Sequence, residues 1–263
     1  MMLEFKNFSF SYDKPKKKAK NYLLKNLSFS ITPNALTAIL APNGTGKTTL
    51  FNVLLGVFDN YEGEILLDSK NLKDYSLKQK AKVLGYIPQH FESPFDFSLL
   101  EVVLMGASPN LGSFEVPNKD IKEKALGLLK NLGLGDRLDS KFHSLSGGQR
   151  QLGLLARLRL QNAKMLLLDE PSAHLDIANE ILFFKNVKKL LESKKTALIN
   201  IHNPSAVLAF CDYVCMIKDS KILAFGSVKE VMNTTNLSLL YDVPLETFTH
   251  NSKTFLDVYK GMC

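Results

Sequence analysis

The stretch that most constrains the fold is residues 36–56, LTAILAPNGTGKTTLFNVLLG. It begins with an apolar run, LTAIL, that predicts a buried strand, and it ends with leucine and phenylalanine residues at helical spacing. Gly44 and Gly46 lie between the two, directly before Lys47 and Thr48. Glycines let successive backbone N–H groups form a concave anion site, and the N-terminus of the following helix adds unpaired amides. The stretch therefore predicts a phosphate-binding loop between a strand and a helix.

Individual residues of this loop predict separate roles. Lys47 is expected to reach the β- and γ-phosphates of a nucleotide, and the Thr48 hydroxyl is expected to hold Mg²⁺. Ala41 stands where the GxxxxGK[ST] pattern has its first glycine. If this position needs a positive φ, the Cβ costs about 1–2 kcal/mol, whereas with a negative φ the replacement is nearly free. The alternative to a phosphate site is a glycine turn followed by a surface lysine.

Length and composition limit the classes of protein to which the chain can belong. With 263 residues, 45% of them hydrophobic and 22% charged, it is expected to be globular, as one large domain or two lobes. No apolar run approaches the roughly 20 residues of a membrane helix, and the N-terminus has no signal-peptide pattern, so we expect a cytoplasmic protein. The three cysteines, Cys211, Cys215 and Cys263, have no disulfide or metal-site spacing and are expected to be small apolar residues.

The net charge of +7 permits binding to nucleic acid or to an anionic membrane surface. Much of the excess lies in residues 14–20, KPKKKAK. A platform for single-stranded nucleic acid requires aromatic residues on which the bases stack, and no aromatic residue separates these lysines. We therefore favour a solvated hairpin tip over a binding patch.

A repeated pattern near the N-terminus predicts a pair of strands. KNFSFS at residues 6–11 is echoed by KNLSFS at residues 25–30, and in both copies the alternation of apolar residues changes parity across Lys-Asn. Alternation predicts half-buried strands, and the change of parity predicts a β-bulge. The two segments are expected to pair antiparallel, joined by the lysine-rich loop.

The remaining chain alternates apolar runs with helical patterns, which indicates a parallel sheet covered on both faces. The expected strands are residues 64–68, 84–89, Met165–Asp169 and Thr196–Ile201, with a terminal hairpin at residues 213–217 and 222–224. The expected helices are Leu77–Val83 and residues 177–193, with amphipathic helices around residues 121–132 and 152–158 in a helical insert.

The strand Met165–Asp169 places two carboxylates, Asp169 and Glu170, at its end. Ligands of open parallel sheets lie beyond the carboxyl ends of the strands. Asp169 is therefore expected to hold Mg²⁺, and Glu170 is a candidate general base for an attacking water. The alternative is an acidic strand end or helix cap, which the four preceding apolar residues and the earlier phosphate loop disfavour.

A second anion site is expected at residues 145–149, LSGGQ, which begin a helix. Ser146 is suited to be the N-cap, and Gly147 and Gly148 allow another backbone or a ligand to approach closely. A helix N-terminus of this kind favours anions, although an ordinary capped helix has the same local chemistry.

The order of these motifs resembles the ATP-binding cassette (ABC) family over nearly the whole chain. In that resemblance, residues 41–48 are similar to Walker A, Gln89 to the Q-loop, residues 145–149 to the signature, residues 166–170 to Walker B, residues 172–176 to the D-loop and His202 to the switch histidine. It implies an α/β fold, a P-loop NTPase (RecA-like) core with an antiparallel β lobe and an inserted helical subdomain. Residues 1–88 and 165–232 would form the core, 89–164 the helical subdomain and 233–263 a tail to which we assign no chemistry.

The resemblance also implies ATP and Mg²⁺ as cofactors. The nucleotide-binding residues that it implies are Tyr12 (against adenine), Ala41, Pro42, Asn43, Gly44, Thr45, Gly46, Lys47, Thr48, Thr49, Ser146, Gly147, Gly148 and Gln149. The implied catalytic residues are Lys47, Gln89, Glu170 and His202, and the implied metal ligands are Thr48, Gln89 and Asp169. Two cassettes would pack head to tail as a homodimer, with each ATP between the Lys47 loop of one and Ser146 and Gly148 of the other.

Residues 95–106 and 170–177 are similar to ATPases of importers for iron chelates, haem and cobalamin. This implies an ATP-hydrolysing subunit on the cytoplasmic face of the bacterial inner membrane, bound to an integral membrane permease that an external substrate-binding protein supplies. No nucleic acid partner is expected. One alternative is a nucleotide-binding module that does not hydrolyse ATP, suggested by Ala41. Another is a soluble ABC protein acting on nucleic acid, which the lack of a long coiled-coil insert or a second cassette disfavours.

Overall fold

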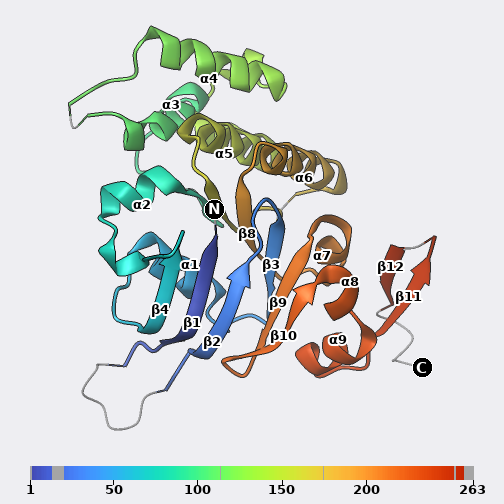
Figure 1. Ribbon diagram of the computed structural model, residues 1–263. Helices are drawn as coiled ribbons and strands as arrows, with labels where there is room; N and C mark the ends of the chain where they lie inside the picture. The colour runs from blue at the N-terminus through green and yellow to red at the C-terminus, as the bar shows by residue number, and fades with distance from the viewer. Residues whose placement is uncertain (1, 14–20, 113, 174, 252, 258–263) are drawn as a thin grey trace. The chain divides into compact units, whose positions relative to one another are not determined.

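The computed structural model describes residues 2–13, 21–112, 114–173, 175–251 and 253–257 (Figure 1). The chain forms two compact units, one made of Met1–Ser76 and Thr196–Cys263 and the other of Leu77–Lys195. The lysine-rich loop at residues 14–20 and His174 of the D-loop lie outside the described residues. The domain boundaries that the resemblance implies stay a prediction.

The first unit contains the predicted antiparallel lobe. Strands β1 (Leu3–Phe10), β2 (Leu24–Ile31), β4 (Glu62–Leu67) and β5 (Lys70–Asn71) form a sheet in the order β2-β1-β4-β5 (Figure 1). The register of β1 against β2 shifts between Phe5 and Phe8. Asn7 and Asn26 have φ of 51° and 53°, a region that asparagine tolerates better than most residues. The strands and the irregularity predicted at both Lys-Asn pairs are confirmed.

The first unit also contains parallel strands, and the phosphate loop follows one of them. Strand β3 (Leu36–Leu40) pairs in parallel with β8 (Thr196–Ile201) and β9 (Tyr213–Lys218), and β9 pairs antiparallel with β10 (Lys221–Ser227). Both β3 and β8 are buried along their whole length. Helix α1 (Lys47–Leu55) follows β3, as predicted, and α7 (Pro204–Phe210) follows β8.

The described residues of the C-terminal tail form more secondary structure than the sequence indicates. The short helix α8 (Val228–Val231) precedes the tail, and the tail itself contains α9 (Thr234–Tyr241) and a hairpin of β11 (Glu246–His250) and β12 (Lys253–Asp257). The Tyr241 hydroxyl donates to the carbonyl of His202 at 3.1 Å, so the tail holds the segment that follows β8.

The second unit is built around one long helix, α5 (Gly147–Gln161), and a pair of parallel strands, β6 (Leu84–Ile87) and β7 (Met165–Asp169). Helix α5 packs against α3 (Leu99–Leu104), α4 (Lys119–Asn131), α6 (Ile177–Glu192), β6 and the 3₁₀ segment η2 (Met105–Asn110). The other elements are the helix α2 (Leu77–Val83) and, across both units, the short 3₁₀ segments η1 (Leu72–Asp74), η3 (Gly135–Arg137) and η4 (Phe142–Ser144).

The predicted helices α2, α4, α5 and α6 are confirmed, whereas the spacing of apolar residues did not indicate the short helix α3. None of the helices in the described part of the chain combines the length and the apolar character that crossing a bilayer requires.

The close packing of η2 on α5 predicts a strong effect of a single methyl group. A Cβ at Gly106 would lie 2.2 Å from the carbonyl oxygen of Arg157, and backbone cannot move aside as a side chain can. We expect Gly106→Ala to lower the free energy of unfolding by about 2–3 kcal/mol in a urea titration. Gly127→Ala on α4 is the matched control, because its Cβ position has no atom within 4 Å apart from the adjoining residues and the backbone of its own helix. It should raise stability by about 0.5–1 kcal/mol, and equal stability of the two variants would contradict the packing argument.

Candidate nucleotide-binding and hydrolysis site

The phosphate loop of the first unit has the backbone that anion binding requires. Gly44 and Gly46 have φ of 79° and 93°, and Gly46 is the N-cap of α1. The Lys47 ammonium donates to the carbonyls of Ala41 at 2.8 Å and of Pro42 at 3.2 Å, and only 7% of the residue is exposed. The loop thus folds around the lysine and holds its charge beside the helix N-terminus, where a phosphate is favoured.

The structure answers the question that Ala41 raises. Its φ is outside the positive range, and its side chain is buried. A Cβ at this position is therefore compatible with the loop, and the first glycine of the pattern is not needed for its backbone.

We accordingly expect Ala41→Gly to leave the steady-state rate of phosphate release within about twofold of the wild type, a change of about 0.4 kcal/mol in the barrier. The variant should be less stable by about 0.5–1 kcal/mol, because glycine gives the unfolded chain more freedom. A large gain in turnover would show instead that the Ala41 methyl group strains the loop.

Tyr12 is held beside the start of α1 with much of its ring exposed. A hydrogen bond of 2.7 Å joins its hydroxyl to Thr49 Oγ1. The ring meets Phe10 and Phe58 edge to face, at centroid distances of 5.0 and 5.6 Å, and 63% of the residue is exposed. An aromatic ring fixed in this way can stack on a flat base, as the prediction for adenine requires.

His202 lies at the same edge of the first unit as the phosphate loop. In the parallel register of β3 and β8, Leu40 is opposite Ile201. The phosphate loop, which follows Leu40, and His202, which follows Ile201, therefore begin at the same end of the two strands. The contact of His202 with a γ-phosphate stays a prediction.

The second unit brings together the carboxylates and the Q-loop glutamine. In the register of β6 and β7, Ile87 is opposite Leu168, so Gln89 and Glu170 follow at the same end. The Gln89 amide donates to Glu170 Oε2 at 2.9 Å. Glu170 has φ of 44°, a left-handed conformation that costs about 1–3 kcal/mol in a residue other than glycine and that is typical of functional positions.

Asp169 is 1% exposed, and its Oδ2 accepts a hydrogen bond of 3.3 Å from the Tyr86 hydroxyl. The sequence motifs did not single out Tyr86. A buried carboxylate with a hydrogen-bonded oxygen is a suitable ligand for a hard cation such as Mg²⁺.

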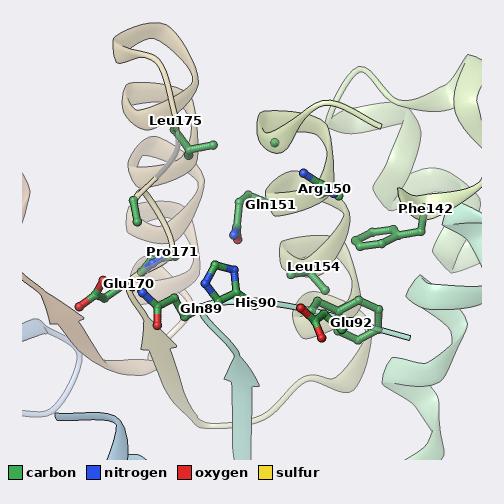
Figure 2. Close-up of a pocket in the computed structure, with 13 residues that line it drawn as sticks. Gln89, His90, Glu92, Phe142, Arg150, Gln151, Leu154, Glu170, Pro171 and Leu175 are labelled. Atoms are coloured by element: carbon green, nitrogen blue, oxygen red, sulfur yellow. Dashed lines mark hydrogen bonds between the residues drawn. The ribbon is translucent and has the colours of Figure 1, made fainter. Parts of the chain in front are cut away.

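A pocket of about 190 Å³ extends from Gln89 and Glu170 to the start of α5 (Figure 2). Gln89 and Glu170 line one side, and Arg150, Gln151 and Leu154 of α5 line another. The acidic side chain of Glu92 also lines it. The pocket therefore joins the candidate general base to the signature helix within one unit.

The signature residues form the capped helix N-terminus that the sequence predicts. Ser146 Oγ accepts from the backbone N–H of Gln149 at 3.3 Å, and Gln149 Oε1 accepts from the backbone N–H of Ser146 at 3.1 Å. A Cβ on Gly148 would lie 2.5 Å from the side chain of Asn179 on α6. The packing of α5 against α6 therefore favours glycine at position 148, independently of the nucleotide contact that is expected of Gly148.

The structure brings the predicted residues together in two groups. Tyr12, residues 41–49 and the His202 segment belong to the first unit, whereas Gln89, residues 146–149 and the two carboxylates belong to the second. The predicted Mg²⁺ ligands are therefore divided between the units.

Comparison with known proteins identifies the family. Residues 24–173, more than half of the chain, match the family model described as ABC transporter. A Helicobacter pylori protein named "Probable iron chelatin transport ATP-binding protein" is 43% identical over 256 residues, which cover 96% of this chain and 98% of the relative. The molybdate import ATP-binding protein MolC of Haemophilus influenzae is 31% identical, over 99% of this chain and 98% of the relative.

A solved structure is consistent with the family of these relatives. A transporter described as of the metal-chelate type, in an inward-facing conformation, superposes with a TM-score of 0.82 and 29% identity over 99% of both chains. The P-loop NTPase fold expected from the sequence is thereby confirmed. The chain belongs to the ABC transporter family and is one of its ATP-hydrolysing, ATP-binding proteins.

Proposed function

We propose that the chain is the ATP-hydrolysing subunit of a bacterial importer for an iron chelate or a related metal complex, such as haem or cobalamin. The observation that supports this most is the 43% identity to the H. pylori protein over 96% of the chain. The superposition on a transporter described as of the metal-chelate type points the same way. The subunit would bind a membrane permease at the cytoplasmic face of the inner membrane, and an external binding protein would deliver the substrate to that permease.

The site residues fit a magnesium nucleotide. In this proposal Lys47 offsets the charge of the β- and γ-phosphates, and Tyr12 stacks on the adenine. Thr48, Gln89 and Asp169 would hold Mg²⁺, which supplies further charge neutralisation when bound. The fit rests on the lysine enclosed by its loop and on the buried, hydrogen-bonded Asp169 carboxylate.

Glu170 is the residue that we assign to the proton transfer. Its carboxylate would accept a proton from the attacking water and so orient that water toward the γ-phosphate, while His202 contacts the same phosphate. In the present arrangement Gln89 donates to this carboxylate, so the glutamine fixes the orientation of the base.

A homodimer would complete each site. The Ser146 side chain is exposed at the N-terminus of α5, where a partner's γ-phosphate is favoured by the helix amides. Each ATP would then lie between Lys47 of one copy and Ser146 and Gly148 of the other. ATP can close such a dimer only because it binds the closed state more tightly than the open one.

The experiment that tests the proposal is co-purification of the chain with its permease, followed by ATP-dependent uptake in vesicles. Iron–siderophore, haem and cobalamin would be supplied separately with the binding protein. Uptake of one of them, abolished without ATP, would support the proposal, and ATP-driven uptake of none would remove the metal-chelate assignment. Phosphate release with and without the permease would show whether turnover is coupled to transport.

A further inference from the structure

Tyr86 contacts the proposed metal-binding carboxylate from the neighbouring strand. In the parallel register of β6 and β7, Tyr86 is opposite Leu167, so Asp169 lies two residues farther along the same face. A long aromatic side chain can reach such a diagonal neighbour. The Tyr86 hydroxyl does so, donating to Asp169 Oδ2 at 3.3 Å.

The direction of this hydrogen bond follows from the two groups that form it. An ionised carboxylate oxygen can only accept, so the Tyr86 hydroxyl is the donor. A hydrogen bond to a buried charged group restrains the orientation of the carboxylate.

The backbone of Tyr86 is held in turn by the signature helix. Arg157 of α5 donates from Nη2 to the Tyr86 carbonyl at 2.8 Å, and its guanidinium lies 5.1 Å from the ring centroid of Phe91, just after the Q-loop glutamine. Burial lowers the pKa of Arg157 to about 10, so the group stays cationic at neutral pH.

The signature helix packs closely on this strand beside Tyr86. A Cβ on Gly85 would lie 2.4 Å from Leu158 Cδ1 of α5. A displacement of α5 at Arg157 would consequently move the strand that carries the phenol.

We propose that Tyr86 is a positioning residue that fixes the Asp169 carboxylate for Mg²⁺, and that Arg157 couples this carboxylate to the signature helix. The inference rests on the proposed role of Asp169 as a metal ligand. It adds a physical connection, entirely within the second unit, between the metal-binding strand and the helix that begins at Ser146.

The test measures metal binding directly. Mn²⁺ would replace Mg²⁺, and free Mn²⁺ would be followed by electron paramagnetic resonance in the presence of a non-hydrolysable ATP analogue. Tyr86→Phe keeps the ring and removes only the hydroxyl. We expect its Mn²⁺ dissociation constant to rise about tenfold, as for the loss of one hydrogen bond to a charged group. An unchanged or tighter dissociation constant would overturn the inference.

Tyr75→Phe is the matched control. Its hydroxyl donates to the Leu67 carbonyl at 2.9 Å in the first unit, so the variant also loses one phenolic hydrogen bond but should bind Mn²⁺ normally. Asp169→Asn separates the two proposals. If it leaves Mn²⁺ binding intact, the metal role of Asp169 in the proposed function fails. If it abolishes binding while Tyr86→Phe changes nothing, only the positioning role of Tyr86 fails.

The coupling to Arg157 has its own test in a double-mutant cycle. Arg157→Lys keeps the charge but removes the planar group over Phe91. We expect it to weaken Mn²⁺ binding about threefold in the wild type and to add nothing in the Tyr86→Phe background, because the route through the phenol is already broken. Equal effects in both backgrounds would show that Arg157 acts independently of Tyr86.

Discussion

Replacing Glu170 by glutamine is expected to slow ATP hydrolysis about a thousandfold, within the range that a positioned general base contributes. Glutamine has nearly the same size and can still accept a hydrogen bond from Gln89, whose present bond to Glu170 is 2.9 Å. It cannot take a proton from water. ATP binding should therefore be kept, and the closed dimer should accumulate. Phosphate release in a single turnover, with size-exclusion chromatography in Mg²⁺-ATP, measures both effects.

Glu92→Gln is the control for this experiment, because Glu92 lines the same pocket and the substitution removes the same charge. We expect turnover close to the wild type, since Glu92 does not follow the β7 strand. Normal hydrolysis by Glu170→Gln would exclude Glu170 as the base. An equal loss in both variants would indicate that the charge of the pocket matters, and that no single carboxylate acts as the base.

The sequence predicted those strands and helices that depend on residues close together in the chain. The change of parity at Lys6-Asn7 and Lys25-Asn26 indicated a β-bulge, and the structure has register shifts and left-handed asparagines there. The short helix α3 carried a different signal, the Ser98 and Glu101 capping box, which the spacing of apolar residues does not include.

The parts that the sequence did not predict depend on residues far apart in the chain. Tyr86 and Asp169 are 83 positions apart, and Arg157 is 71 positions from Tyr86, so no periodicity or motif relates them. The φ of Ala41 likewise depends on the folded loop, and so the consequence of replacing the first glycine could be stated only as two alternatives. The order of the motifs identified the candidate site residues, whereas the contacts that orient these residues are formed only in the folded chain.

Replacing Lys47 by methionine is expected to raise the ATP dissociation constant about 100-fold, or about 2.7 kcal/mol, because a charged group in contact with phosphates is lost. Methionine keeps most of the apolar stem in the buried position. Stabilisation by ATP gives the readout. At an ATP concentration of about 100 times the wild-type dissociation constant, ATP should stabilise the wild type by about 2.7 kcal/mol and the variant by only about 0.4 kcal/mol.

Lys195→Met distinguishes loss of nucleotide binding from loss of a buried lysine. The Lys195 ammonium donates to Asn162 Oδ1 at 2.9 Å and to the Ala163 carbonyl at 2.7 Å, as Lys47 donates to two carbonyls of its loop. Either substitution removes two hydrogen bonds that a buried ammonium donates and should lower the stability of the nucleotide-free protein. Only Lys47→Met should also remove the stabilisation by ATP, because Lys47 alone of the two follows the glycine loop. If Lys47→Met kept that stabilisation in full, the phosphates would have to bind elsewhere on the chain.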